Sequence, residues 1–285
     1  MMISYAQYGE DVVLNRIFGQ QSTGFYVDVG ANDPLVDSVT QHFYVKGWSG
    51  INIEPLAGPF ERLAQARPRD INLNVAVSDR QGLLLFHELP VKAGLSTFNP
   101  ELAAHYRSQG ELMVEKRIPT IPLREICETH VRQPIDFMKI DAEGHEYEVV
   151  LGMDWIRWRP RVLVIEAGWH PERWESMLLE ASYLRGALRD NYNHFYVREE
   201  DRGLLPLLQL PANVTDQYVP YELYRAVEQN REWESMGSVI TTIARALNRF
   251  KRRHPRIASV AKVAMLRAGL MPRDPGRAAE KPNSQ

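Results

Sequence analysis

The stretch VDVGAND, residues 27–33, closes a β-rich run that starts at Phe25. It carries an acid, Asp28, two places before a single glycine, Gly30. Turns that bind a dinucleotide pyrophosphate follow a strand in the same way, but they carry three glycines because the phosphates need close approach to bare backbone. The stretch therefore predicts a ligand-binding turn of an α/β sheet, and a ligand without a pyrophosphate.

The segments around this turn alternate between strand and helix patterns. Runs rich in β-branched and aromatic residues predict strands, whereas apolar residues at helical spacing, bounded by Gly or Pro, predict helices. The predicted strands are residues 25–29, 51–54, 71–77, 83–88, 137–141 and 162–166, with two more within 183–198; the predicted helices include 10–18 and 38–46. Such alternation is typical of an α/β sheet wound with right-handed crossovers.

Acidic residues lie at or just after the end of almost every predicted strand: Asp28, Glu54, Asp79, Asp141 and Glu166. In open α/β sheets the ligand lies beyond the carboxyl ends of the strands. A row of carboxylates there suits a cationic or neutral nucleoside better than a phosphorylated one. S-adenosylmethionine has a sulfonium, an ammonium and no phosphate, so the pattern favours it as the cofactor, with Glu54 accepting hydrogen bonds from both ribose hydroxyls.

Seven stretches occur in an order that chance does not explain. They are SYAQYGEDVVL (4–14), GFYVDVGANDPLVDSVTQHFYVKGWSGINIEP (24–55), LNVAVSD (73–79), FMKIDAEGHEYEVVLG (137–152), VLVIEA (162–167), NHFYV (193–197) and LPANVTDQYV (210–219). Together they resemble the FkbM-type S-adenosylmethionine-dependent methyltransferases. The resemblance implies a Rossmann-like class I fold with a seven-stranded, mostly parallel sheet and helices on both faces. It also implies methyl transfer, usually to an oxygen of a sugar or polyketide.

The same resemblance indicates which residues bind the cofactor. Gly30 lets the backbone approach the methionine moiety, and Asp28 either meets the ammonium through a water or holds the following loop. Residues 7 and 8 belong to a segment that folds over the cofactor or, alternatively, to an ordinary helix start. The expected cofactor-binding set is Gln7, Tyr8, Asp28, Gly30, Asn32, Glu54, Ser78 and Asp141.

Methylation of a hydroxyl needs in-line attack on the methyl carbon and removal of a proton whose pKa is far above 7. The candidate catalytic residues are Asp141, Glu166 and His170, and Asp141 is the first choice as the base. Asp141 also suits the cap of the next helix, and His170 suits a helix start before Pro171, so these alternatives stay open. A magnesium ion held by the same three residues is not favoured, because hard-oxygen sites have no fixed sequence spacing.

The polar segment 91–116 is predicted to be irregular and to form a lid or substrate insertion. Its Ser96 and Thr97 are candidate contacts for the acceptor. Further substrate candidates are Glu143, His145 and Trp169. His145 equally suits a solvated surface position, and Trp169 suits either sugar stacking or packing in the core.

Charge divides the chain into two regions. Residues 237–285 hold 11 Lys and Arg against Asp274 and Glu280, a net charge of +9. Since the whole chain has a net charge of −2, residues 1–236 carry about −11. We expect a methyltransferase domain at 1–236 and a basic helical extension at 237–285 with a disordered end. The extension suits an anionic membrane surface. A solvated helix, or a contact between copies of the chain in a homo-oligomer, remains the alternative.

The remaining features indicate the compartment and the partners. A single cysteine, Cys127, and an N-terminus without a basic and apolar leader favour the cytoplasm, with any membrane contact peripheral and at its inner face. A nucleic-acid partner is not expected, because the catalytic half is acidic and no (D/N)PPY-type motif is present. The expected partner is a sugar or glycan hydroxyl.

The expected function is O-methyl transfer from S-adenosylmethionine to a sugar of a glycan or glycosylated metabolite. An NAD-dependent oxidoreductase is the second hypothesis, since Glu54 also suits an NAD ribose, but the chain lacks G-x-G-x-x-G after its first strand. A non-catalytic, membrane-recruited binding module on the same fold is the third.

Overall fold

The computed structural model describes residues 1–188, 192–229 and 231. Contacts divide the chain into two units, Met1–Tyr221 and Glu222–Gln285, and the described part of the second unit is helical. The basic extension predicted at 237–285 lies outside the described residues. Among the residues that are described, no helix has the length and hydropathy that a bilayer crossing requires.

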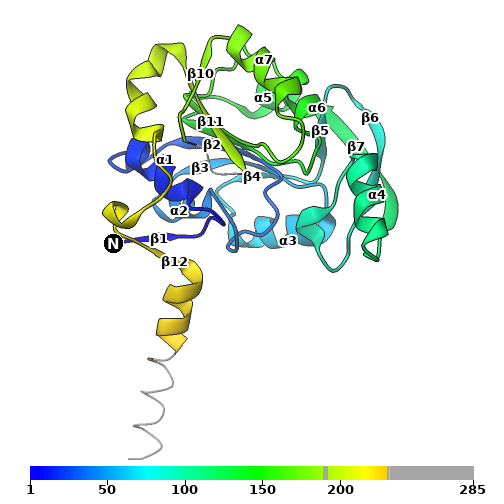
Figure 1. Cartoon of the computed structure of the whole chain (residues 1–285), viewed down its shortest axis with the longest axis horizontal. Coiled ribbons are helices and arrows are strands. Elements are labelled where there is room, and N and C mark those ends of the chain that lie inside the picture. Colours follow the sequence, from blue (N-terminus) through cyan, green and yellow to red (C-terminus); the bar gives the residue numbers. More distant parts are fainter. Residues whose placement is uncertain (189–191, 230, 232–285) are drawn as a thin grey trace, which may run out of the picture. The chain divides into compact units, whose positions relative to one another are not determined.

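Seven strands form the main sheet, in the order β10-β11-β9-β8-β2-β3-β4 (Figure 1). The pairings from β9 through β8, β2 and β3 to β4 are parallel, and β11 pairs antiparallel with both β9 and β10. The α/β fold is confirmed, and the sheet is mixed. The strands are β2 (Phe25–Val29), β3 (Ser49–Ile53), β4 (Ile71–Leu73), β8 (Phe137–Ile140), β9 (Val162–Glu166), β10 (Tyr183–Arg185) and β11 (Asn193–Arg198).

Helices cover both faces of this sheet because its central strands are apolar on both sides. Side chains alternate along β2, so that Val27 joins one core cluster and Tyr26 the other. Helices α5, α6 and α7 pack on the Val27 side, and α1 and α2 pack on the Tyr26 side. The helices are α1 (Glu10–Phe18), α2 (Gln41–Val45), α3 (Ala57–Ala66), α4 (Pro100–Ser108), α5 (Leu123–His130), α6 (Glu146–Leu151) and α7 (Glu172–Glu180).

A smaller sheet of β5 (Ala76–Ser78), β7 (Val114–Pro122) and β6 (Gly82–Glu88) flanks the main one. The strand predicted at 71–77 is thus two strands in different sheets. Between them, the Asn74 amide donates to the backbone oxygens of Glu54 and Pro55, at 2.9 and 3.0 Å. These bonds hold the chain where it leaves the main sheet, a tertiary contact that strand propensity does not encode.

The segment predicted to be irregular at 91–116 contains ordered elements, namely a 3₁₀ turn η1 (Ala93–Leu95) and helix α4. The Asn99 side chain caps α4 by accepting from the N–H groups of Glu101 and Leu102, and Pro100 occupies the first turn. Both residues are strong helix-start signals. The prediction missed this helix because it weighed the polarity of the segment above its Asn-Pro start.

The N-terminal strand β1 (Met2–Ser4) pairs in parallel with β12 (Tyr218–Pro220), close to the end of the unit. Arg16 on α1 reinforces this closure. Its guanidinium forms two bonds of 2.7 Å with Asp216 and donates to the carbonyl oxygens of Leu210 and Pro211, at 2.5 and 2.8 Å. The chain between β11 and β12 includes the 3₁₀ segments η2 (Glu199–Leu208) and η3 (Val214–Asp216).

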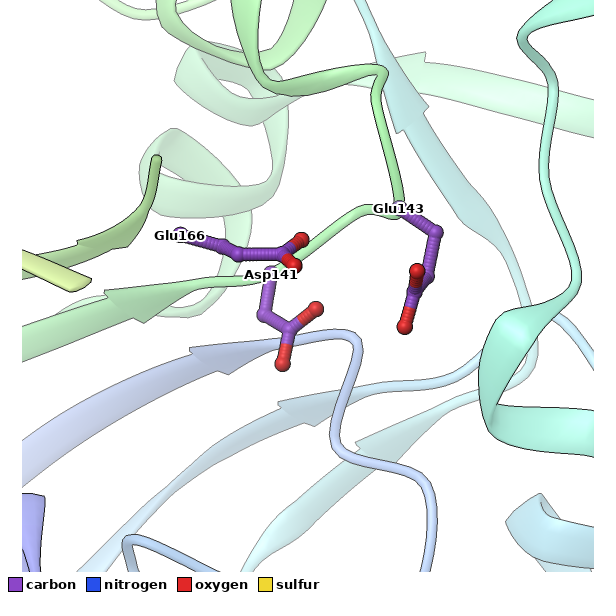
Figure 2. A group of neighbouring side chains, drawn as sticks. All are labelled: Asp141, Glu143 and Glu166. Atoms are coloured by element: carbon purple, nitrogen blue, oxygen red, sulfur yellow. The ribbon is translucent and has the colours of Figure 1, made fainter. Parts of the chain in front are cut away.

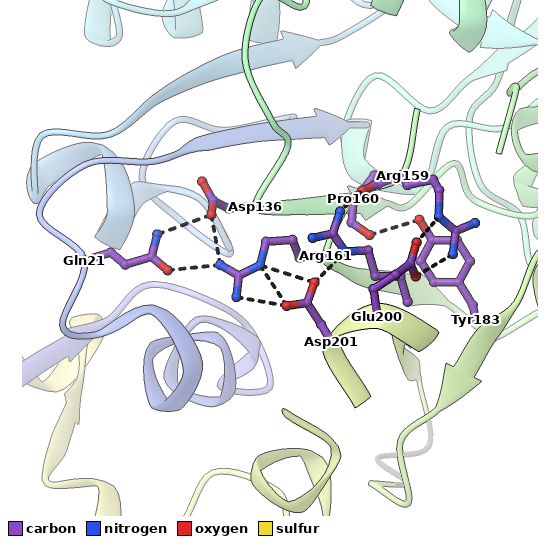
Figure 3. Close-up of polar contacts among 9 residues, drawn as sticks. Gln21, Asp136, Arg159, Pro160, Arg161, Tyr183, Glu200 and Asp201 are labelled. Carbon is purple, nitrogen blue, oxygen red and sulfur yellow. Dashed lines mark hydrogen bonds and ion pairs between the residues drawn. The ribbon is translucent and has the colours of Figure 1, made fainter. Parts of the chain in front are cut away.

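A polar network ties together the beginnings of β2, β8 and β9 (Figure 3). Arg161, directly before β9, donates to Gln21 at 3.2 Å and contacts Asp136 at 3.4 Å and Asp201 at 3.2 Å. Neighbouring Arg159 forms two bonds of 2.8 Å with Glu200. Since these residues lie at the amino ends of parallel strands, the network stabilises the end of the sheet opposite the ligand edge.

Candidate active site

A cavity lies at the carboxyl ends of β2, β3 and β8. Strand β2 pairs with β3 on one side and with β8, much later in the chain, on the other, so the cavity occupies the point where the strand order reverses. Polar residues from these strand ends and apolar residues from the smaller sheet line it. They include Gln7, Gly30, Asn32, Glu54, Leu56, Val77, Phe86, Ser96, Asp141, Glu143 and His145.

Gly30 is required by the packing of two turns. Its φ is +73°, and a Cβ there would lie 1.8 Å from the carbonyl oxygen of Asp141. Any side chain would therefore push the turn after β2 away from the turn after β8. The single glycine of VDVGAND has this structural role in addition to the backbone access that the sequence indicated.

Glu54 is buried at the end of β3, and its carboxylate faces the cavity. One oxygen accepts from the N–H of Asn32 at 2.9 Å, and the other accepts from the N–H of Leu56 at 2.8 Å. Burial raises the pKa of Glu54 to about 7 despite these bonds. Each carboxylate oxygen has two acceptor positions, so one position on each oxygen remains for a ligand.

Lys139 is a buried cation that the sequence prediction missed. Its Nζ lies 3.5 Å from Asp28 Oδ1 and 3.2 Å from Asp141 Oδ2, and it donates to the carbonyl oxygen of Gly30 at 2.7 Å. Burial alone would lower the pKa of this ammonium, but the carboxylates of Asp141 and Asp28 raise it above its ordinary value. A lysine inside the apolar run 137–140 was the available signal.

Asp28 lies behind the cavity wall. It is 1% exposed, accepts from the Thr40 hydroxyl at 2.8 Å and pairs with Lys139. Of the two roles expected for it, contact with the ligand ammonium through a water finds no support in the cavity lining, which does not include Asp28. Asp28 acts on the site by holding Lys139, which in turn contacts Asp141.

Three carboxylates converge beside the cavity (Figure 2). Asp141 and Glu143 follow β8, Glu166 ends β9, and one oxygen of each lies within 4.8 Å of the others. Burial, with the charges of Asp141 and Glu146, raises the pKa of Glu143 to about 9. Burial and the neighbouring carboxylates also raise the pKa of Glu166 well above its ordinary value. At neutral pH the cluster therefore retains protons, because adjacent buried carboxylates do not all ionise together.

The turn that carries this cluster is stabilised from within. Glu146, buried at the start of α6, accepts from the N–H groups of Ala142 and Gly144 at 2.8 and 3.2 Å. Glu143 itself has a φ of +51°, a conformation that most side chains avoid. The bonds of Glu146 therefore hold Glu143 in a backbone geometry that directs its carboxylate toward Asp141 and Glu166.

His145 is buried rather than solvated. Its Nε2 lies 3.1 Å from the Ser78 hydroxyl, and its Nδ1 lies 3.3 Å from Glu148. Burial lowers the pKa of His145 to about 4, so the ring is neutral at physiological pH. Ser78, expected at the cofactor, is fully buried behind this ring and does not line the cavity.

Residues 97 and 99 are bonded to the turn that follows β8. Thr97, fully buried, donates to the carbonyl oxygen of Glu143 at 2.5 Å, and the Asn99 amide donates to that of Gly144 at 3.3 Å. The Thr97 hydroxyl is therefore not available to bind the substrate that accepts the methyl group. Ser96 does line the cavity, and its hydroxyl accepts from the N–H of Leu89 at 3.0 Å.

The remaining candidates lie at or outside the rim. Gln7 lines the cavity, whereas Tyr8 stacks on Tyr192 with ring centroids 4.5 Å apart. His170 is exposed and pairs with Glu172 at 2.9 Å. It is not part of the carboxylate cluster, so Glu143 replaces it in any metal-ligand set built on Asp141 and Glu166.

Comparison with known proteins identifies the family. The profile described as Methyltransferase FkbM domain matches residues 28–196, more than half of the chain. The chain belongs to the FkbM methyltransferase family. Methyl transfer is the activity that this membership implies, with S-adenosylmethionine as the usual methyl donor.

Among solved structures, the FkbM methyltransferase of Methylobacillus flagellatus KT, a crystal structure at 2.20 Å resolution, is similar to the chain. The two share 15% sequence identity with a TM-score of 0.43, and the match covers 68% of this chain and 48% of the other. The chain thus spans about half the length of that structure. No curated protein matches the sequence.

The lining of the cavity combines carboxylates with apolar groups. Glu54, Asp141 and Glu143 are among its acids, and Leu56, Val77 and Phe86 are among its apolar residues. The lining cation, Lys139, is neutralised by two acids. A ligand with positive charge, ribose hydroxyls and an aromatic base matches this combination, whereas a pyrophosphate does not.

Proposed function

We propose that the protein is an S-adenosylmethionine-dependent O-methyltransferase that acts on a sugar hydroxyl. The observation that carries the proposal is the cluster of Asp141, Glu143 and Glu166 at the edge of a cavity suited to a cationic nucleoside. Family membership supports methyl transfer. The carboxylates provide the proton acceptor that an attacking hydroxyl requires.

Residues of the cavity divide the work of binding. Glu54 would accept hydrogen bonds from the ribose hydroxyls, and Leu56, Val77 and Phe86 would enclose the adenine. The backbone at Gly30 and the side chain of Gln7 also line the cavity and would hold the methionine moiety. Bound in this way, S-adenosylmethionine supplies an electrophilic methyl carbon.

Glu143 is the better candidate for the base than Asp141, the first choice from sequence. Oδ2 of Asp141 lies 3.2 Å from Nζ of Lys139, so this carboxylate is already engaged in an ion pair. Within the described part of the chain, Glu143 forms no salt bridge, and burial together with the charges of Asp141 and Glu146 raises its pKa to about 9. We assign Asp141 to positioning the donor and Glu143 to accepting the hydroxyl proton.

Glu166 completes the arrangement as a neutral acid. Its hydrogen bond with Asp141 favours the protonated form of the Glu166 carboxyl. A protonated Glu166 donates to Asp141 and leaves Glu143 as the ionisable member nearest the cavity. The three acids would then differ in role because Lys139 lies nearest to only one of them.

Calorimetry with S-adenosylhomocysteine, S-adenosylmethionine and NAD tests the binding half of the proposal. The two adenosyl ligands should bind, NAD should not, and Glu54→Gln should weaken binding about 5- to 150-fold, equivalent to 1–3 kcal/mol. Glu61→Gln, an exposed change on α3, is the matched control. Unchanged affinity in Glu54→Gln would reject the ribose assignment.

Transfer of a labelled methyl group tests the chemical half. Incubation with S-adenosylmethionine and a panel of methyl glycosides should give O-methylated sugar, identified by mass spectrometry and NMR. Methylation of nitrogen or carbon only, or hydride transfer with NAD, would reject the proposed reaction.

A further inference from the structure

A groove adjoins the cavity at the ends of β2, β3 and β8, and the two hollows meet at His145. His145 and Phe98 line both hollows, so their side chains form the wall between them. Three segments bound the groove: the start of α4, the turn 144–148 and the loop that leads into α7. Its polar and aromatic lining comprises Asn99, Glu101, Glu148, Trp169, His170 and Arg173.

The groove borders the carboxylate cluster. Its residues Gly144 and His145 directly follow Glu143 in the turn after β8. On the other side, the loop after β9 folds back on Glu166, since a Cβ at Gly168 would lie 3.3 Å from the Oε1 atom of Glu166. A molecule that presents a hydroxyl to the cluster therefore has this groove available for its remaining atoms.

The lining combines one aromatic surface with polar groups of both charges. Trp169 is half-buried, and its ring meets that of His170 edge-on, with centroids 5.2 Å apart. Arg173 lies over the Tyr147 ring at 4.3 Å, and Glu148 already contacts His145 at 3.3 Å. Because Glu101 and Glu148 oppose Arg173, the groove does not present the single positive field that an acidic ligand would need.

This composition matches the two kinds of surface on a sugar ring. The C–H face of a pyranose is apolar and packs on an indole, while its hydroxyls need planar donors and acceptors at the edge. Trp169 supplies the first. The second amide N–H of Asn99, beside the one that donates to Gly144, and Nε2 of His170, whose Nδ1 pairs with Glu172, supply the second.

We propose that this groove is the acceptor subsite and that it takes a neutral sugar ring seated on Trp169. The inference rests on the proposed O-methyl transfer and narrows its substrate class. His145 then separates the donor cavity from the acceptor groove, and the hydroxyl to be methylated passes beside it to Glu143.

Saturation-transfer NMR on the full chain, without methyl donor, tests the subsite independently of catalysis. The probes are methyl α-D-mannopyranoside, methyl α-L-rhamnopyranoside and, as the charged comparison, methyl β-D-glucuronide. At least one neutral glycoside should receive saturation. Trp169→Ala should reduce it by about fivefold or more, and Trp169→Phe should retain most of it because an aromatic face remains.

Trp158→Ala, a change at a partly buried tryptophan outside the groove, is the matched control and should leave the signal unchanged. Affinity of Trp169→Ala for S-adenosylhomocysteine, measured by calorimetry, should equal that of the unmodified chain and confirms that the variant is folded. Equal saturation of a neutral glycoside by Trp169→Ala would overturn the subsite. A glucuronide signal that exceeds the neutral ones and disappears in Arg173→Gln would overturn its neutral preference.

The subsite and the proposed reaction can fail separately. Glycoside binding that depends on Trp169, without methyl transfer to any glycoside, would reject the reaction and retain the groove. Sugar methylation with an unchanged KM for the acceptor in Trp169→Ala would retain the reaction and reject the groove.

Discussion

Replacement of Lys139 by methionine tests whether a buried cation holds the catalytic turns together. Methionine preserves the apolar stem but removes the ammonium group, which lies 3.5 Å from Asp28 and 3.2 Å from Asp141. Removal of one partner from a buried ion pair typically costs about 3–5 kcal/mol. Because a domain of this size has a total stability of about 5–15 kcal/mol, this loss is a large part of it.

The expected effect is measurable in two ways. Urea denaturation followed by circular dichroism should give a free energy of unfolding lower by about 3–5 kcal/mol. Thermal melts should show a Tm lower by roughly 6–20 °C, since each kcal/mol corresponds to about 2–4 °C in a domain of 150–250 residues. Lys92→Met, which removes a half-exposed pair with Glu111, is the control and should cost less than about 1 kcal/mol.

A second variant identifies the cause. In Lys139→Met combined with Asp28→Asn, the unpaired buried charge is gone, so more than half of the lost stability should return. Simple addition of the two single-variant losses would refute the argument, as would a loss below about 1 kcal/mol in Lys139→Met alone.

Three further predictions concern catalysis, stability and the tail. The pKa of Glu143, raised to about 9, keeps its carboxyl protonated below that pH, so kcat/KM should rise between about pH 7 and 9. Glu143→Gln should be at least about 100-fold slower and should lose this rise. An identical pH profile in the variant would contradict the base assignment. Arg161→Ala should lower the free energy of unfolding by about 1–3 kcal/mol and leave S-adenosylhomocysteine affinity unchanged, whereas Arg157→Ala, which breaks an exposed pair, should cost less than about 1 kcal/mol. Deletion of residues 237–285 should abolish sedimentation with anionic vesicles at low salt, because each basic group contributes about 1 kcal/mol near such a surface; equal sedimentation of both proteins would assign the tail to another role.

The sequence was sufficient for the order of strands and helices and for the acids at the strand ends. Apolar runs marked β2, β3, β8 and β9, because strands covered on both faces are apolar throughout. Parallel strands then bring their carboxyl ends to one edge, so Glu54, Asp141 and Glu166 were expected there. Glu54 and Asp141 do line one cavity, and Glu166 meets Asp141 beside it.

Contacts between distant segments could not be predicted in this way. Lys139 reaches Asp28 across neighbouring strands, and His145 is buried because Ser78, 67 residues away, lies against it. Glu143 joins the carboxylates because of a left-handed backbone conformation, and His170 turns outward to Glu172 instead. Each outcome depends on a side-chain direction or a turn that residue spacing alone leaves undetermined.

Because β1 pairs in parallel with β12, the first strand of the unit can pair only after the last strand has been synthesised. Until residues 218–220 have been synthesised, β1 lacks its partner strand, and the segment that carries Gln7 to the cavity lacks the support of this pairing. The main sheet can form earlier, since its strands end at Arg198. A released chain truncated after residue 211 should therefore retain the strands of the main sheet but lack the β1–β12 pairing beside the segment of Gln7.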